Sequence, residues 1–197
     1  MARSSKQTED DNPQEWLDHH GDYLFRYAII RVSGRETAED LVQETFLAAL
    51  KNYSSFDDKS SIRTWLTGIL RHKIMDYYRH IYKSDKHNVD FEGGNLDDFI
   101  ESGIHKGRWR PDRVPQNWSE WPDESLHESE FLRILNKCLD DLPDRIATVF
   151  RMSQLEELDT KFICKELEIS TTNYWVIMHR ARSGLRRCLE ILWLDKS

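Results

Sequence analysis

Apolar residues recur three or four positions apart along most of this chain, which is the spacing that lines one face of an α-helix. No stretch alternates between apolar and polar residues in the manner of a half-buried strand, so the sequence predicts an all-α protein. The predicted helices cover approximately residues 13–32, 37–52, 62–79, 132–142, 143–155, 160–167 and 171–194.

The same periodicity predicts which face of a helix is buried. In the helix over 62–79, Leu66, Leu70 and Ile74 fall on one apolar stripe. Met75 and Tyr78 fall on the other side, with the basic residues. We therefore expect the first three in the core and the last two outside it.

The helical pattern stops between the third and fourth helices. Residues 84–127 contain a Gly-Gly pair, three prolines and only scattered apolar residues, a composition that favours a partly disordered linker. We therefore expect two small helical domains, over 13–83 and 128–197, after a disordered tail over 1–12. Three tryptophans in the linker either dock on a partner or pack on the chain's own domains.

Length and composition narrow the class of protein. The chain has 197 residues, enough for one large or two small domains, and its apolar fraction of 39% is too high for a wholly disordered protein. No apolar run reaches the roughly 18 residues of a membrane span. Residues 1–12 are polar and lack the apolar core of a signal peptide. We expect a cytoplasmic protein without membrane insertion.

The cysteines are odd in number and far apart. Cys138, Cys164 and Cys188 contain no Cys-x-x-Cys pair, so they fit neither a disulfide framework nor a zinc knuckle. For a protein without an export signal, this pattern predicts three buried, reduced thiols.

Charge is distributed unevenly along the chain. The net charge is −7, but residues 62–83 carry five basic residues against one acidic residue, and residues 160–188 carry six against two. The segment 84–131 carries twelve acidic residues against five basic ones, so the predicted flexible linker is acidic. Local potential steers a polyanion more than net charge does, so both basic segments are candidate nucleic-acid contacts.

Residues 159–188 have the plan of a helix-turn-helix, a short helix and a longer one joined by a tight turn. The longer helix has a buried stripe that includes Tyr174, Ile177, Leu185 and Cys188. Its outward side would reach base edges and phosphates, or it is an ordinary surface whose arginines are solvated. The outward residues are Thr172, Asn173, Trp175, Val176, His179, Arg180, Arg182 and Arg186.

Two further surfaces have a functional and a structural interpretation. The helix over 62–79 mixes Trp65 and other aromatic residues with cations, which suits unstacked bases, although the same aromatic residues could form core. The helix over 37–52 carries a polar stripe through Asp40, Gln43 and Glu44 that is either solvated or, because Leu47 interrupts it, a protein contact.

Several motifs, in this order and spacing, resemble those of bacterial RNA polymerase sigma factors. The run Ala38–Phe46 (AEDLVQETF) resembles the motif that binds core polymerase. Phe56, with TWL at 64–66 and DYYR at 76–79, resembles the segment that reads the −10 element. HRARSGLR at 179–186 resembles the domain that reads the −35 element. Two domains without a third are typical of the extracytoplasmic-function class, group 4 of the sigma-70 family.

The resemblance implies a role for each matching position. Polymerase contact is implied for Asp40, Leu41, Gln43, Glu44, Phe46 and Leu47, with Leu41 and Phe46 possible internal supports. Contact with −10 DNA is implied for Lys59, Ser60, Ser61, Arg63, Trp65, Arg71, Asp76 and Arg79. Contact with −35 DNA is implied for the outward residues of the last helix. The sequence departs from the family at Trp175, Val176 and Ile177, which predicts a different −35 sequence with more apolar and shape readout.

The implied partners are core RNA polymerase, through the clamp helices of its β′ subunit and its β flap, promoter DNA, and an anti-sigma factor. The implied function is transcription initiation at a stress or envelope regulon. The main alternative is a stand-alone helix-turn-helix regulator, which gives no role to residues 38–46. The sequence has no His-Glu-x-x-His, Gly-rich phosphate loop or nucleophile motif, so we expect no catalysis, cofactor or metal.

Overall fold

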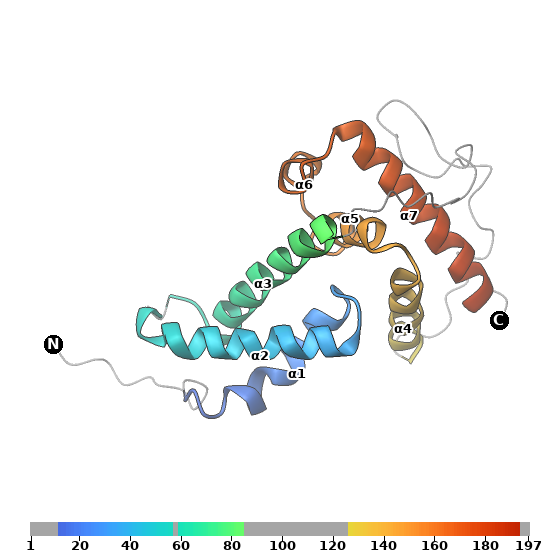
Figure 1. Cartoon of the computed structure of the whole chain (residues 1–197). Helices are drawn as coiled ribbons and strands as arrows, with labels where there is room; N and C mark the ends of the chain where they lie inside the picture. Colours follow the sequence, from blue (N-terminus) through green and yellow to red (C-terminus); the bar gives the residue numbers. More distant parts are fainter. Residues whose placement is uncertain (1–11, 57–58, 85–125, 194–197) are drawn as a thin grey trace. The chain divides into compact units, whose positions relative to one another are not determined.

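The computed structural model describes residues 12–56, 59–84 and 126–193, and these residues are helical with short connections (Figure 1). They fall into two compact units, Met1–Tyr78 and Arg79–Ser197. The expected tail and most of the expected linker, with its tryptophans, lie outside the described residues. The helices are α1 (Trp16–Ile29), α2 (Arg35–Asn52), the 3-10 turn η2 (Tyr53–Ser55), α3 (Ile62–Ser84), α4 (Leu126–Asp140), α5 (Asp144–Gln154), α6 (Thr160–Glu166) and α7 (Thr171–Leu192).

The first unit is built from α1, α2 and most of α3. Leu24 of α1 and Leu66, Leu70 and Ile74 of α3 have no exposed surface, so the predicted apolar stripe of α3 lies in the core. Gly34 separates α1 from α2 and has φ 82°, a left-handed conformation that a residue without Cβ adopts without steric penalty.

Polar side chains define where α1 and α3 begin. Ser61 Oγ accepts a hydrogen bond from the Thr64 N–H at 3.2 Å, which caps α3. Asn12 Oδ1 accepts from the Gln14 N–H at 3.2 Å, but the residues that follow form a turn, and α1 begins only at Trp16.

The prediction for the outer side of α3 is partly wrong, because two residues assigned to it are buried. Tyr78 has no exposed surface and its hydroxyl donates to the Arg31 carbonyl at 2.7 Å. Met75 is 9% exposed. Both side chains are covered because the buried face of α3 is wider than the narrow stripe that periodicity assigns.

The second unit contains the helix-turn-helix formed by α6 and α7. Asp159 caps α6 by accepting from the Lys161 N–H, and Ser170 caps α7 by accepting from the Asn173 N–H. In the turn between them, Glu168 has φ 56° and the Ile169 N–H donates to the Cys164 carbonyl at 3.0 Å. This bond satisfies an orphan carbonyl at the end of α6 in the Schellman arrangement.

Helices α4, α5 and α6 all contact α7, around fully buried side chains such as Leu139, Met152, Ile163 and Met178. Arg151 of α5 is also buried, with 3% of its side chain exposed, and its guanidinium pairs with Asp140 at 2.8 Å. Helix α7 therefore forms part of the core of this unit and packs against three other helices.

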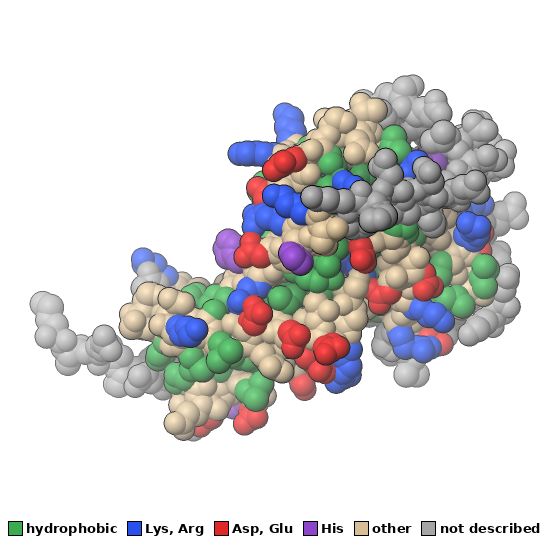
Figure 2. All heavy atoms as spheres, viewed as in Figure 1, with side chains coloured by type: hydrophobic (Ala, Val, Ile, Leu, Met, Phe, Trp, Pro, Cys, Tyr) green, Lys and Arg blue, Asp and Glu red, His purple; other side chains and the backbone are tan. Residues whose placement is uncertain are grey.

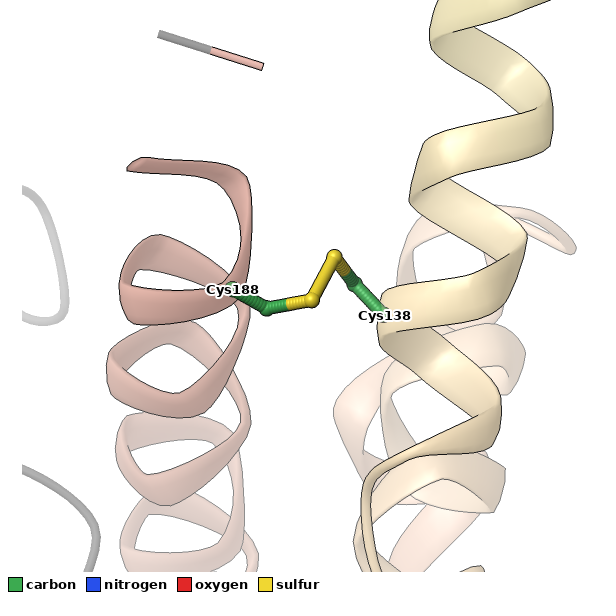
Figure 3. Close-up of a disulfide and its surroundings, with 2 residues drawn as sticks. All are labelled: Cys138 and Cys188. Atoms are coloured by element: carbon green, nitrogen blue, oxygen red, sulfur yellow. A yellow bond between two sulfur atoms is a disulfide. The ribbon is translucent and has the colours of Figure 1, made fainter. Parts of the chain in front are cut away.

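The prediction of three reduced thiols is wrong. Cys138 of α4 and Cys188 of α7 form a disulfide across a Cα–Cα distance of 5.7 Å (Figure 3), and only Cys164 is free. Spacing along the chain concealed the pair, because the α4–α7 packing brings together residues 50 positions apart. In the part of the chain that the structure describes, no helix has the length and apolar character to cross a membrane.

Candidate functional site

The α2 surface, which we define as Asp40, Gln43, Glu44 and Leu47, is exposed along its whole length. Leu47 is 58% exposed, so it adds apolar surface beside these polar residues. Glu44 Oε2 accepts a hydrogen bond from Lys73 Nζ of α3 at 2.8 Å, so the two side chains form an ion pair between α2 and α3. Figure 2 shows acidic side chains gathered over the N-terminal half of α2.

Leu41 and Phe46, the apolar candidates of the 38–46 motif, are less exposed than the α2 surface. Leu41 is 9% exposed and Phe46 is half-buried. Leu41 therefore supports α2 from the core, while the polar residues Asp40, Gln43 and Glu44 are exposed.

The start of α3 carries four exposed candidate residues, Lys59, Ser60, Ser61 and Arg63. The Arg63 guanidinium lies over the Tyr23 ring, 5.1 Å from its centroid. Cationic and hydroxyl donors thus stand together at one end of the helix, as a site for a nucleic-acid strand requires.

Trp65 belongs to an aromatic cluster, which we define as Trp16, Tyr53, Phe56 and Trp65. The ring of Trp65 lies 5.0 Å from Phe56 and 6.0 Å from Trp16, centroid to centroid. Trp16 is buried, whereas the other three are half-buried. The cluster therefore combines a buried ring with rings that solvent partly reaches, and Trp65 is only partly in the core.

The remaining −10 candidates lie along α3. Arg71 and Asp76 are exposed. Arg79 is half-buried and lies within the second unit, where its Nε donates to Glu166 at 2.6 Å. The structure thus leaves Arg71 and Asp76 open to solvent and engages Arg79 in an ion pair.

The outward residues of α7 differ in exposure along the helix. Thr172, Asn173 and Val176, in the first two turns, are exposed. Val176 is 38% exposed, so it is not core. Trp175 is half-buried with its ring edge-on to Tyr174, 5.0 Å between centroids. The N-terminal turns of α7 therefore present two polar side chains and an apolar one.

The basic residues further along α7 are more enclosed. His179, Arg180, Arg182 and Arg186 are all half-buried. Burial lowers the pKa of Arg182 from its ordinary value, against a smaller raising effect from Tyr174. Arg186 Nε donates to Glu190 at 2.7 Å. The three arginines are therefore partly enclosed by the fold and are not simply solvated.

Two residues that sequence reasoning left out of the site are Lys161 and Lys165 on α6, both exposed. The first helix of a helix-turn-helix crosses the DNA backbone, so cations there suit phosphates. Their signal was present in the basic charge of residues 160–188. Among the described residues, no group of three or more His, Cys, Asp or Glu side chains could hold a metal ion.

Comparison with known proteins identifies the family. Residues 16–82 match the family model of sigma-70 region 2, and residues 132–185 match that of sigma-70 region 4. A probable RNA polymerase sigma factor of Haemophilus influenzae is 34% identical over 170 residues, 84% of each chain. The sigma factor YlaC of Bacillus subtilis is 30% identical over 84% of this chain and 82% of its own length.

The chain belongs to the sigma-70 family of RNA polymerase sigma factors. It is of the extracytoplasmic-function type, as is the similar SigM of Bacillus subtilis, which is 24% identical over 83% of this chain and 86% of its own length. This sigma factor directs RNA polymerase to promoters, and it is a non-enzymatic subunit.

Region 2 of the sigma factor contains the α2 surface, the aromatic cluster and the exposed α3 residues named above, and region 4 contains α5, α6 and most of α4 and α7. A solved sigma factor, RpoE of Bartonella quintana in complex with the anti-sigma factor NepR, aligns with 91% of this chain and 97% of its own. Its sequence identity is 22% and its TM-score 0.40, too low for the likeness to carry weight.

Proposed function

We propose that this sigma factor docks on core polymerase through the α2 surface, captures −10 DNA at the start of α3, and anchors −35 DNA with α7, at promoters of a stress or envelope regulon. The observation that carries the proposal is the division of the 38–46 motif. Leu41 is buried while Asp40 and Gln43, together with Leu47 just after the motif, are exposed, so this part of α2 presents a contact surface on a supported helix.

The polymerase partners in this proposal are the β′ clamp helices for the α2 surface and the β flap for region 4. Polar groups around an exposed leucine suit a protein interface, because the leucine supplies apolar burial and the polar residues fix register. Glu44 is already paired with Lys73, so Asp40 and Gln43 carry the polar contacts in this account.

Capture of the −10 element is assigned to Lys59, Ser60, Ser61, Arg63, Trp65 and Arg71, with Asp76 beside them. A base taken out of the stack needs hydrogen-bond donors and an apolar wall. The exposed hydroxyls and cations supply donors, and the half-buried rings of the aromatic cluster supply the wall. Because Arg79 is ion-paired with Glu166, its role requires exchange of that partner for DNA.

Recognition of the −35 element is assigned first to Thr172, Asn173 and Val176. An asparagine side chain pairs with the edge of adenine, and methyl groups contact thymine, so these residues favour A·T pairs. Lys161, Lys165 and Arg180 are assigned to phosphates, which position the helix without specifying sequence. Trp175, His179, Arg182 and Arg186 border this face.

The domain plan in this proposal is region 2 over 13–83, a linker over 84–127 and region 4 over 128–197, after a tail over 1–12. The factor works in the cytoplasm, where the polymerase is. An anti-sigma factor completes the proposal, because an uninhibited factor would transcribe its regulon continuously.

Run-off transcription with core polymerase and a genomic fragment library tests the proposed function. Transcripts should begin downstream of a shared two-part element, and core polymerase alone should not select those starts. Random starts would overturn the proposal. A gel shift without polymerase tests the alternative of a stand-alone regulator, which would bind duplex DNA tightly by itself, whereas this sigma factor should bind it poorly.

A further inference from the structure

A covalent bond closes region 4 around its DNA-binding motif. The Cys138–Cys188 disulfide joins the last turn of α4 to α7 across 50 positions of sequence (Figure 3). The closed loop contains α5, α6 and the N-terminal turns of α7, which together include the entire helix-turn-helix.

The two sulfur positions differ in access to solvent. Cys138 has no exposed surface, whereas Cys188 is half-buried. A small thiol or disulfide can therefore reach the pair at Cys188, while Cys138 is enclosed by α4 and its neighbours. RNA polymerase acts in a compartment where thiols are kept reduced, and disulfides found there are usually transient and redox-sensing.

We propose that thiol–disulfide exchange at Cys138 and Cys188 is a redox switch that sets the stability of region 4 and thereby its hold on −35 DNA. The oxidised form is the tighter-binding one. The proposal rests on the −35 role proposed above for α7, and the experiments below separate the two.

The exchange balances with a low-molecular-weight disulfide such as glutathione disulfide as oxidant. The Cys188 thiolate attacks one glutathione sulfur, forms a mixed disulfide and releases one glutathione thiolate. The Cys138 thiolate then attacks the Cys188 sulfur and releases the second. Two cysteine thiols are oxidised, one glutathione disulfide is reduced to two thiols, and the cysteine protons pass to the released thiolates.

The disulfide is remote from the residues assigned to −35 bases, so the switch acts by changing the free energy of unfolding of region 4. Val176 and Cys188 are twelve positions apart on one helix, roughly 18 Å along its axis. The bond therefore leaves Thr172, Asn173 and Val176 unobstructed. A helical domain of this size buries a small core, so a cross-link that constrains its unfolded chain has a large relative effect.

The first experiment measures the switch without DNA. Full-length sigma factor is equilibrated with mixtures of reduced and oxidised glutathione, quenched in acid, alkylated in denaturant so that every free thiol reacts, and weighed by mass spectrometry. The reduced chain should take up three alkyl groups and the oxidised chain one, on Cys164. Amide exchange in α5 and α7 should be at least roughly tenfold slower in the oxidised chain. Equal exchange rates would overturn the proposal.

Matched variants assign the effect to this pair. Cys164→Ser should keep the full difference, since Cys164 is outside the bond. Cys188→Ser, at a half-buried position that tolerates the change better than Cys138, should abolish it. If the exchange rates of Cys188→Ser still differ between oxidising and reducing conditions, the proposal is overturned. The main comparison, of oxidised with reduced wild-type chain, does not depend on a variant that could misfold.

The second experiment links the switch to promoters. Oxidised and reduced sigma factors are freed of glutathione and assembled with the same core polymerase. Transcription is then measured on two templates. The first is a promoter with −10 and −35 elements, and the second is a pre-opened template that needs only −10 contacts. The oxidised factor should yield several-fold more transcript from the first template and an equal amount from the second. Equal yields from the first would overturn the switch, whereas no promoter-specific transcript in either state would overturn the proposed function.

Discussion

At the scale of single residues, a buried hydroxyl ties α3 to the turn after α1. Tyr78 has no exposed surface, and its hydroxyl donates to the Arg31 carbonyl at 2.7 Å. Its neighbour Tyr77 is half-buried, and its hydroxyl accepts a longer bond of 3.4 Å from the Ser33 N–H. The two adjacent tyrosines therefore differ in what their hydroxyl groups contribute.

Replacing Tyr78 by Phe should lower the free energy of unfolding of region 2 by about 1 kcal/mol, because a buried hydrogen bond is lost and the Arg31 carbonyl loses a donor. Urea unfolding of the full chain, followed by helical circular dichroism, measures the change. Tyr77→Phe is the matched control and should have the smaller effect. Equal losses in both variants would contradict this account of Tyr78.

The sequence predicts the burial of single residues well where the period of one helix decides it. It predicts burial poorly where packing against other helices decides it. Leu66, Leu70 and Ile74 are buried as expected. Tyr78 was placed outside, because the width of a buried face depends on neighbouring helices that the period of one helix does not record. The Cys138–Cys188 pair was missed for the same reason, since packing of α4 on α7 sets the approach of the two Cα atoms.

At the scale of elements, a capping side chain fixes where the recognition helix begins. Ser170 Oγ accepts from the Asn173 N–H at 3.1 Å, and Asn173 is itself assigned to base contact. Replacing Ser170 by Ala should lower the free energy of unfolding of region 4 by about 1 kcal/mol and loosen the first turn of α7. Amide exchange in that turn measures the effect.

The control for this cap is Ser60→Ala, since Ser60 is exposed beside the capping Ser61 of α3. Ser60→Ala should leave the unfolding free energy of region 4 unchanged. An unchanged exchange rate in Ser170→Ala would show that the cap does not hold the first turn.

Helix boundaries were predictable where a capping residue was visible in the sequence. The starts of α3, α6 and α7 agree with expectation, and each follows a capping Ser or Asp. The sequence pattern predicts the first helix from residue 13, but α1 begins at Trp16, because Asn12 accepts a hydrogen bond within a local turn before the helix. The end of α3 at Ser84 was missed, since no Gly or Pro marks it.

The α2 surface gives a prediction at the same scale. Replacing Asp40 and Gln43 together by Ala should weaken binding to core polymerase several-fold and leave folding intact, because both side chains are exposed. Fluorescence anisotropy of labelled sigma factor titrated with core polymerase measures affinity. The control is Lys51→Ala, since Lys51 is exposed at the end of the same helix. An unchanged affinity in the double variant would show that core polymerase does not contact the α2 surface.

At the scale of the whole molecule, the division of charge mattered more than its total. A net charge of −7 argues against a nucleic-acid partner, yet the basic segments 62–83 and 160–188 coincide with helices of region 2 and region 4. The order and spacing of motifs identified the family, and two helical units were predictable from periodicity. The sequence alone did not show which arginines are enclosed, because burial of Arg182 depends on its surroundings in the folded unit.

The central claim is that one chain selects promoters through two separate surfaces. The most direct test is transcription from a promoter library randomised at both elements, with wild-type sigma factor and with the double variant Asn173→Ala/Val176→Ala. Wild-type factor should show base preferences at both elements, and the variant should lose those at −35 while keeping those at −10. Unchanged −35 preferences in the variant, or a wild-type factor without preference at either element, would contradict the account.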